Sequence, residues 1–141
     1  MFKFRLEPAL RYRASIVQKN QRELAVVNTK FQQEKDKLVD LKNKRKSISE
    51  KYSDELGNLT SEEMVFYDNY FSRASAEIDN QIQVIAEVQI KLDEKRHILN
   101  ESIKQKKIIE TVKNKAYENY LKIEKKKEEA LLDEISSVEH L

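Results

Sequence analysis

Apolar residues recur every seven positions through the first third of the chain. Seven of the eight residues in this row are apolar: Leu10, Val17, Leu24, Phe31, Leu38, Arg45, Tyr52 and Leu59. The companion row is more polar: Arg13, Asn20, Val27, Glu34, Leu41, Ile48 and Glu55. A strict seven-residue repeat predicts a long helix with a narrow coiled-coil seam. We expect this helix over about residues 8–56, with Pro8 in its first turn, where a missing N–H costs nothing.

A second helix is predicted over about residues 61–137, a stretch without Gly or Pro. Its seven-residue row is Met64, Phe71, Ile78, Ile85, Leu92 and Leu99, and its companions include Tyr67, Ala74, Val88 and Ile109. The row then continues with Lys106 and Lys113. We therefore expect the apolar stripe to move onto another set of residues, as it would if the packing partner changed. That set is Ile109, Val112, Ala116, Tyr120 and Ile123.

One turn separates the two helices, at about residues 57–60. Gly57 and Asn58 both tolerate the left-handed conformation that ends many helices. Thr60 and Glu63 have the T-x-x-E spacing of a capping box, and Ser61 is the alternative cap. These signals predict an all-α fold: an antiparallel coiled-coil hairpin that forms one domain over residues 1–141.

The predicted helices differ in length, at roughly 70 and 110 Å. Folding back at Asn58 places residue 10 opposite about residue 107. Everything after Ile109 then overhangs, by about 30 residues or roughly 45 Å. The overhang has an apolar stripe with Leu131, Ile135 and Val138, and an exposed stripe of this kind usually marks an interaction site.

The composition agrees with long helices and narrows the class of protein. The 141 residues include one Gly, one Pro and no Cys, and 27 basic residues nearly balance 25 acidic ones. Disorder is the alternative for so charged a chain, but the regular spacing argues against it. The sequence has no apolar run of about 18 residues, and its start lacks the apolar segment of a signal peptide. We expect a soluble cytoplasmic protein.

No pattern of catalytic or ligand-binding residues stands out. The chain has no phosphate-binding glycine loop and no Cys/His cluster, and its two histidines, His97 and His140, are far apart. Its carboxylates alternate with lysines at helical spacing, as on ordinary solvated helix surfaces. We therefore expect a protein that is not an enzyme, with no catalytic residues, cofactor, metal or small-molecule substrate.

Charged and aromatic residues gather at particular places. Residues 1–22 are basic, residues 104–127 carry nine lysines, and the last fourteen residues are acidic. Arginine suits protein interfaces, so Arg5, Arg11 and Arg13 are candidate contacts, whereas the lysines fit a solvated face. Nucleic-acid binding is an alternative, although the sequence has no recognisable reading motif. Five aromatic residues lie near the turn, three on the seam and two off it: Tyr52, Tyr67 and Phe71 on the seam, and Phe66 and Tyr70 off it.

Both ends of the chain resemble one family. The start, FKFRLEPALRYR, is similar to the opening of the flagellar type III export protein FliJ, in Phe4, Arg5, Leu6, Leu10, Arg11 and Arg13. The end, YLKIEKKKEEALLDEI, resembles the closing pattern of that family, in Lys127, Glu128, Glu129, Leu132, Asp133 and Glu134. The length and the hairpin plan agree as well, although injectisome relatives share this plan.

The resemblance implies a stalk like that of rotary ATPases, inserted by its N- and C-terminal end into the hexameric ring of the export ATPase FliI. The residues implied for that contact are Phe4, Arg5, Leu6, Leu10, Arg11, Arg13, Tyr120, Ile123, Lys127, Leu131, Leu132, Asp133 and Glu134. It further implies binding to the export-gate protein FlhA at the inner membrane, and chaperone escort of export substrates, with export chaperones as further partners. The implied gate residues are Leu41, Lys44, Ile48, Tyr70 and Ala74, of which Lys44 and Ala74 depart from the bulkier residues expected. A structural coiled-coil spacer or a homodimerising scaffold is the alternative.

Overall fold

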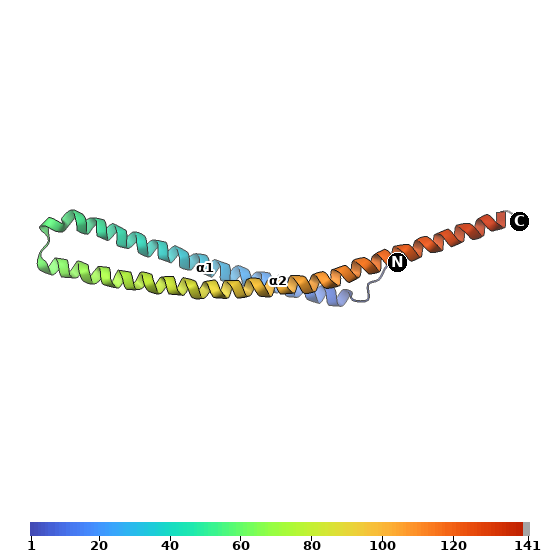
Figure 1. Ribbon diagram of the computed structural model, residues 1–141, viewed down its shortest axis with the longest axis horizontal. Coiled ribbons are helices and arrows are strands. Elements are labelled where there is room, and N and C mark those ends of the chain that lie inside the picture. Colours follow the sequence, from blue (N-terminus) through green and yellow to red (C-terminus); the bar gives the residue numbers. More distant parts are fainter. Residues whose placement is uncertain (140–141) are drawn as a thin grey trace. The chain divides into compact units, whose positions relative to one another are not determined.

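In the computed structural model, which describes residues 1–139, the chain forms two α-helices joined by a short turn (Figure 1). Helix α1 spans Glu7–Glu55, a 3₁₀ turn spans Leu56–Asn58, and helix α2 spans Ser61–Glu139. Residues 1–139 contain no strand. The predicted all-α fold, with two packed helices of which the second is longer, is confirmed.

The chain divides into two compact units. The hairpin unit consists of Arg22–His97 and contains the turn. The terminal unit consists of Met1–Gln21 and Ile98–Leu141, so it combines the start of α1 with the second half of α2. His140, singled out above as a lone histidine, lies outside the described residues.

The turn forms by a different route from the one predicted. Thr60 is the N-cap of α2, because its Oγ1 accepts a hydrogen bond from the Glu63 N–H at 3.2 Å. However, neither Gly57 nor Asn58 adopts a left-handed conformation, and no described residue has a positive φ. The prediction of a left-handed C-cap is therefore wrong. The last turn of α1 tightens into a 3₁₀ turn instead, which is another way to satisfy terminal carbonyl groups.

In the hairpin unit the predicted seam lies between the two helices. Leu92 is 1% exposed and Val88 is 7% exposed, and both belong to the seven-residue rows of α2. Every member of both α1 rows in this unit is buried or half-buried, as is Leu59 in the turn; the α1 members are Leu24, Val27, Phe31, Glu34, Leu38, Leu41, Arg45, Ile48, Tyr52 and Glu55. The seven-residue spacing therefore identified the packed face, including its polar members.

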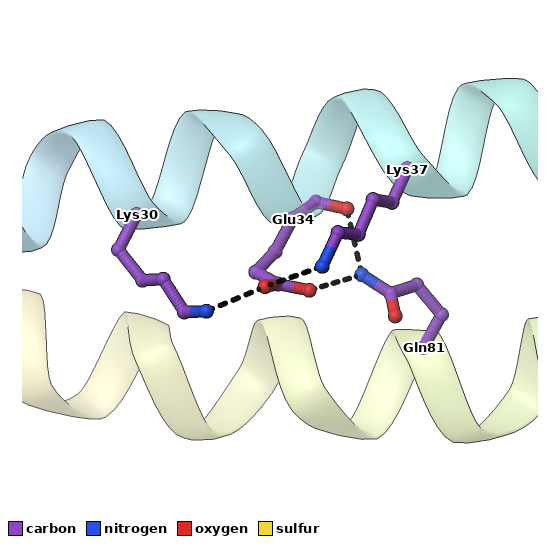
Figure 2. Close-up of polar contacts among 4 residues, drawn as sticks. All are labelled: Lys30, Glu34, Lys37 and Gln81. Atoms are coloured by element: carbon purple, nitrogen blue, oxygen red, sulfur yellow. Dashed lines mark hydrogen bonds and ion pairs between the residues drawn. The ribbon is translucent and has the colours of Figure 1, made fainter.

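One polar member of the seam, Glu34, has a complete set of partners (Figure 2). Its carboxylate accepts a hydrogen bond from Gln81 Nε2 at 2.6 Å and lies 2.9 Å from Lys30 Nζ and 3.4 Å from Lys37 Nζ. These partners, led by the Gln81 hydrogen bond and then Lys30, lower the pKa of Glu34 from 4.5 to about 2, against the opposing effect of burial. Glu34 therefore stays ionised inside the seam.

Both seven-residue rows of α2 stay on the packed face after Leu99. The predicted stripe is therefore right for Ile109, Ala116 and Tyr120, which are half-buried, and wrong for Val112 and Ile123, which are exposed. Lys106 and Lys113, which continue the first row, are half-buried, whereas Val112 is 43% exposed and Ile123 is 52% exposed. Lysine can remain on a packed face because its long aliphatic stem covers apolar surface while its ammonium group reaches a polar partner at the edge. Tyr120, two positions along this row from Lys106, is half-buried as well.

Candidate protein-interaction surfaces

The first residues of the chain dock onto α2 through an aromatic cluster. The ring of Phe2 lies 5.2 Å from the Tyr117 ring, edge to face, and 5.4 Å from the Tyr120 ring. The two tyrosine rings stack on each other at 6.4 Å. Edge-to-face and offset arrangements of this kind are favourable for aromatic rings. Tyr120, one of the predicted ATPase contacts, is therefore half-covered by the chain's own N-terminal segment.

Lys113 joins the same segment to α2 through charge. Its Nζ lies 2.8 Å from Glu7 Oε2 and 5.9 Å from the centre of the Phe4 ring. A turn precedes α1, because the Glu7 N–H donates to the Phe4 carbonyl at 3.2 Å. Phe4 and Leu10, both predicted ATPase contacts, are half-buried in this part of the terminal unit.

The three predicted contact arginines are arranged around the start of α1. Arg5 and Arg11 are exposed, and Arg13 is half-buried with its guanidinium 5.9 Å from the centre of the Tyr12 ring. Leu6, between them in the sequence, is 43% exposed. None of the three arginines pairs with a carboxylate in the part of the chain that the structure describes.

The overhang of α2 begins later than predicted. The prediction counted only from the start of the first helix and left all residues after Ile109 unpaired. Because Phe2 reaches Tyr120, however, the N-terminal segment covers about ten of these residues. Every residue from Leu121 to Glu139 is exposed, which makes the overhang about 19 residues or roughly 28 Å long. We call Leu121–Glu139 the overhang. Six of its large apolar side chains are 47–64% exposed: Leu121, Ile123, Leu131, Leu132, Ile135 and Val138.

The remaining predicted ATPase contacts all lie on this exposed overhang. Lys127 makes a long ion pair with Glu124 at 3.8 Å, and Asp133 and Glu134 are exposed. The side chains of Leu131, Glu134 and Ile135 line a shallow hollow of about 370 Å³ with Val138 and Glu139. The structure thus places the predicted set in two groups within the terminal unit, one around Phe4 and Tyr120 and one along the overhang.

The predicted gate residues line two neighbouring grooves of the hairpin unit. Leu41, Lys44, Tyr70 and Ala74 border one groove of about 190 Å³, together with Arg73 and Glu77. Ile48 and Tyr70 border a second groove of about 370 Å³, with Lys51, Glu55, Leu59, Glu63, Phe66 and Tyr67. All five predicted residues therefore lie along one surface, and Tyr70 belongs to both grooves.

The aromatic residues near the turn divide as the sequence predicts. Tyr52 of α1 packs against Tyr67 and Phe71 of α2, with ring centres 5.0 and 5.7 Å apart. The Tyr67 hydroxyl donates to Glu55 at 3.3 Å, and burial and then the Glu55 charge raise the pKa of Tyr67. Phe66, off the seam, is 66% exposed. Two of the five aromatic side chains thus offer surface to a partner: Phe66, which is exposed although its ring contacts Tyr67, and Tyr70, which is half-buried.

Sequence reasoning missed the roles of Phe2, Tyr117 and Glu34. Phe2 and Phe4 alternate in a non-helical segment, and Tyr117 and Tyr120 are three residues apart on one helix face. These spacings indicate that each pair of aromatic residues lies on one face of its segment. They do not indicate that the two phenylalanines contact the two tyrosines. Glu34 occupies a seam position, and its partner Gln81 occupies one as well.

The observations define an all-helical protein whose two helices pack along a seam interrupted by polar residues and whose second helix ends in an exposed stretch with large apolar side chains. The sequence matches the family described as "Flagellar FliJ protein" over residues 2–141. The chain therefore belongs to the FliJ family, whose members are flagellar export components. Comparisons with curated proteins and with solved structures give no match.

Neither helix, as far as residue 139, has a segment both long and apolar enough to cross a membrane. Among the same residues, no three His, Cys, Asp or Glu side chains come together as a metal site.

Proposed function

We propose that the chain is the non-enzymatic stalk of the flagellar type III export apparatus, which inserts its terminal unit into the hexameric ring of the export ATPase FliI. The observation that carries this proposal is the overhang. Its 19 residues are all exposed and include six large apolar side chains. Exposed apolar surface of this kind is typical of a site that binds a partner protein. Membership of the FliJ family supports it.

The mechanism is coupling. An asymmetric helical stalk contacts the subunits of a six-fold ring unequally, so it binds some subunit conformations better than others. A ligand of this kind shifts the ring toward the conformations that it favours, which promotes ring assembly or ATP hydrolysis. The stalk itself needs no catalytic group.

Three arginines form a basic collar beside the aromatic cluster: Arg5 and Arg11, which are exposed, and Arg13, which is half-buried. In the proposed complex they pair with acidic groups of the ring, for which arginine's planar fork is well suited. Replacing all three by Ala is expected to reduce stimulation of ATP hydrolysis by FliI. The matched control replaces three exposed basic residues of the hairpin unit, Lys35, Lys42 and Lys46. Unchanged stimulation by the collar variant argues against the collar's role.

The two grooves of the hairpin unit are proposed as the contact for the export-gate protein FlhA, with chaperone escort as a further role. Tyr70 borders both grooves and is the natural probe. Tyr70→Ala is expected to weaken FlhA binding in a pull-down, whereas Tyr12→Ala, an exposed tyrosine of the terminal unit, is not. Equal binding by wild type and Tyr70→Ala contradicts this assignment. In this setting the protein is cytoplasmic and associates peripherally with the inner membrane through the apparatus.

A further inference from the structure

One stripe of the overhang follows a regular coiled-coil spacing. It starts from Tyr117, just before the overhang, and advances by alternate steps of four and three residues: Tyr117, Leu121, Glu124, Glu128, Leu131, Ile135 and Val138. Residues with this spacing share one face of a helix and form the seam of a coiled coil when a partner helix is present. From Leu121 onward this face is exposed, since its four large apolar residues are 47–64% exposed, whereas Tyr117 packs against the Phe2 ring.

The stripe is interrupted at its middle by two carboxylates. Glu124 and Glu128 occupy consecutive seam positions, with Tyr117 and Leu121 before them and Leu131, Ile135 and Val138 after them. The only ion pair there joins Glu124 to Lys127 at 3.8 Å, on side chains that are 50% and 71% exposed. A pair so long and so exposed does little to neutralise Glu124. The stripe is therefore apolar, then acidic, then apolar.

This pattern opposes pairing with a second copy of the chain. In a parallel pair, Glu124 and Glu128 of one copy face the same residues of the other, which brings like charges together. In an antiparallel pair, Glu124 and Glu128 of one copy can lie opposite the same two residues of the other copy, which again brings like charges together. They can also lie opposite the apolar residues Leu131 and Ile135, where each carboxylate loses its water without gaining a counter-charge. Both arrangements are costly, because a buried charge needs a counter-charge.

We propose that Glu124 and Glu128 keep the overhang from associating with itself and reserve it for a partner that places a Lys or Arg between two apolar patches. Successive seam positions on a helix are about 5 Å apart along its axis, so the partner's cation lies roughly 5–8 Å from each apolar patch. This inference rests on the proposed function in one respect, since it takes the FliI ring as that partner. The exclusion of self-association does not depend on it.

Sedimentation tests the first half of the proposal on the full chain. Glu124→Leu with Glu128→Leu makes the stripe continuously apolar, and this variant is expected to dimerise at concentrations where wild type is monomeric. The matched control, Glu118→Leu with Glu129→Leu, changes two exposed glutamates that lie off the stripe and is expected to stay monomeric. The proposal is overturned if wild type dimerises through the overhang, if the stripe variant stays monomeric, or if the control dimerises equally.

Stimulation of FliI tests the second half. Glu124→Lys with Glu128→Lys is expected to raise the concentration needed for half-maximal stimulation about tenfold or more, because cation then faces cation. Glu118→Lys with Glu129→Lys makes the same change in net charge off the stripe, and its effect is expected to stay within about twofold. Equal effects of the two variants overturn the partner assignment. If the wild-type chain itself fails to stimulate FliI, the proposed function is wrong and FliI is not the partner of the stripe. Sedimentation still tests whether Glu124 and Glu128 prevent self-association.

Discussion

The side-chain amide of Gln81 donates to two oxygens of Glu34, one on the carboxylate at 2.6 Å and the backbone carbonyl at 2.8 Å. Gln81 belongs to α2 and Glu34 to α1, so this bidentate contact joins the helices across their seam (Figure 2). A polar pair inside a coiled-coil seam commonly selects one register of the two helices. Here it also holds a carboxylate in its charged form.

Glu34 makes the hairpin unit sensitive to acid. The folded chain holds the pKa of Glu34 at about 2, below its ordinary value of 4.5. The stability that Glu34 contributes is therefore fully present above about pH 4.5 and is lost as the pH falls toward 2. Thermal unfolding measured between these values is expected to show a weaker pH dependence for Glu34→Gln than for wild type. Asp40→Asn, at an exposed position, serves as the control and keeps the wild-type dependence; equal slopes for Glu34→Gln and wild type contradict the prediction.

Leu92 is the best-buried apolar residue of the seam. Because it is 1% exposed, Leu92→Ala leaves a cavity and is expected to lower the free energy of unfolding by about 2–5 kcal/mol. The control is Ile90→Ala, at a position that is 60% exposed, where the loss is expected to stay below about 1 kcal/mol. Urea unfolding followed by circular dichroism measures both. Similar losses in the two variants argue against the seam as described.

Gly57 is replaceable despite its place in the turn. Its φ is not positive, and a Cβ added there meets no atom within 4 Å. Gly57→Ala is therefore expected to stabilise the chain by about 0.4–1 kcal/mol, since alanine reduces the freedom of the unfolded chain. Chemical unfolding gives the value. A destabilisation of similar size indicates that the turn adopts the left-handed conformation after all.

Phe2 fastens the N-terminal segment to α2. Removing its ring contacts to Tyr117 and Tyr120 in Phe2→Ala is expected to cost about 0.5–1.5 kcal/mol locally. Hydrogen exchange of the backbone amides measures this change. We expect faster exchange in residues 113–120 and unchanged exchange in the hairpin unit. Phe66→Ala, an exposed aromatic of the hairpin unit, provides the comparison. Exchange rates in residues 113–120 that match wild type contradict the docking of Phe2.

The sequence predicts the helices well because a seven-residue row reports burial directly. The rows that begin at Leu10 and Met64 identify the packed faces, and the T-x-x-E spacing locates the cap at Thr60. The start of the overhang was misplaced because it depends on a contact between distant segments, Phe2 with Tyr120. Neither the periodicity nor the charge of a short non-helical segment specifies where it docks.

The surfaces were predictable only in part. Family resemblance selected residues that do lie together, as with Tyr70 and Ala74 along one groove. Periodicity alone does not show that Lys113 stays on a packed face, because that depends on the position of Glu7 and of the Phe4 ring. The role of Glu34 is also not evident from periodicity. A carboxylate at a seam position suggests a destabilised seam, but Gln81 and Lys30 compensate the charge of Glu34.

The most direct test of the stalk proposal compares the full chain with a version that ends at Tyr120. Since residues 121–139 are all exposed, this truncation is expected to leave the free energy of unfolding unchanged within about 0.5 kcal/mol. ATP hydrolysis and ring assembly by FliI are then measured with each version. We expect the full chain to stimulate both, and the truncated chain, although folded, to stimulate neither. Equal stimulation by the two versions, or none by either, contradicts the stalk proposal.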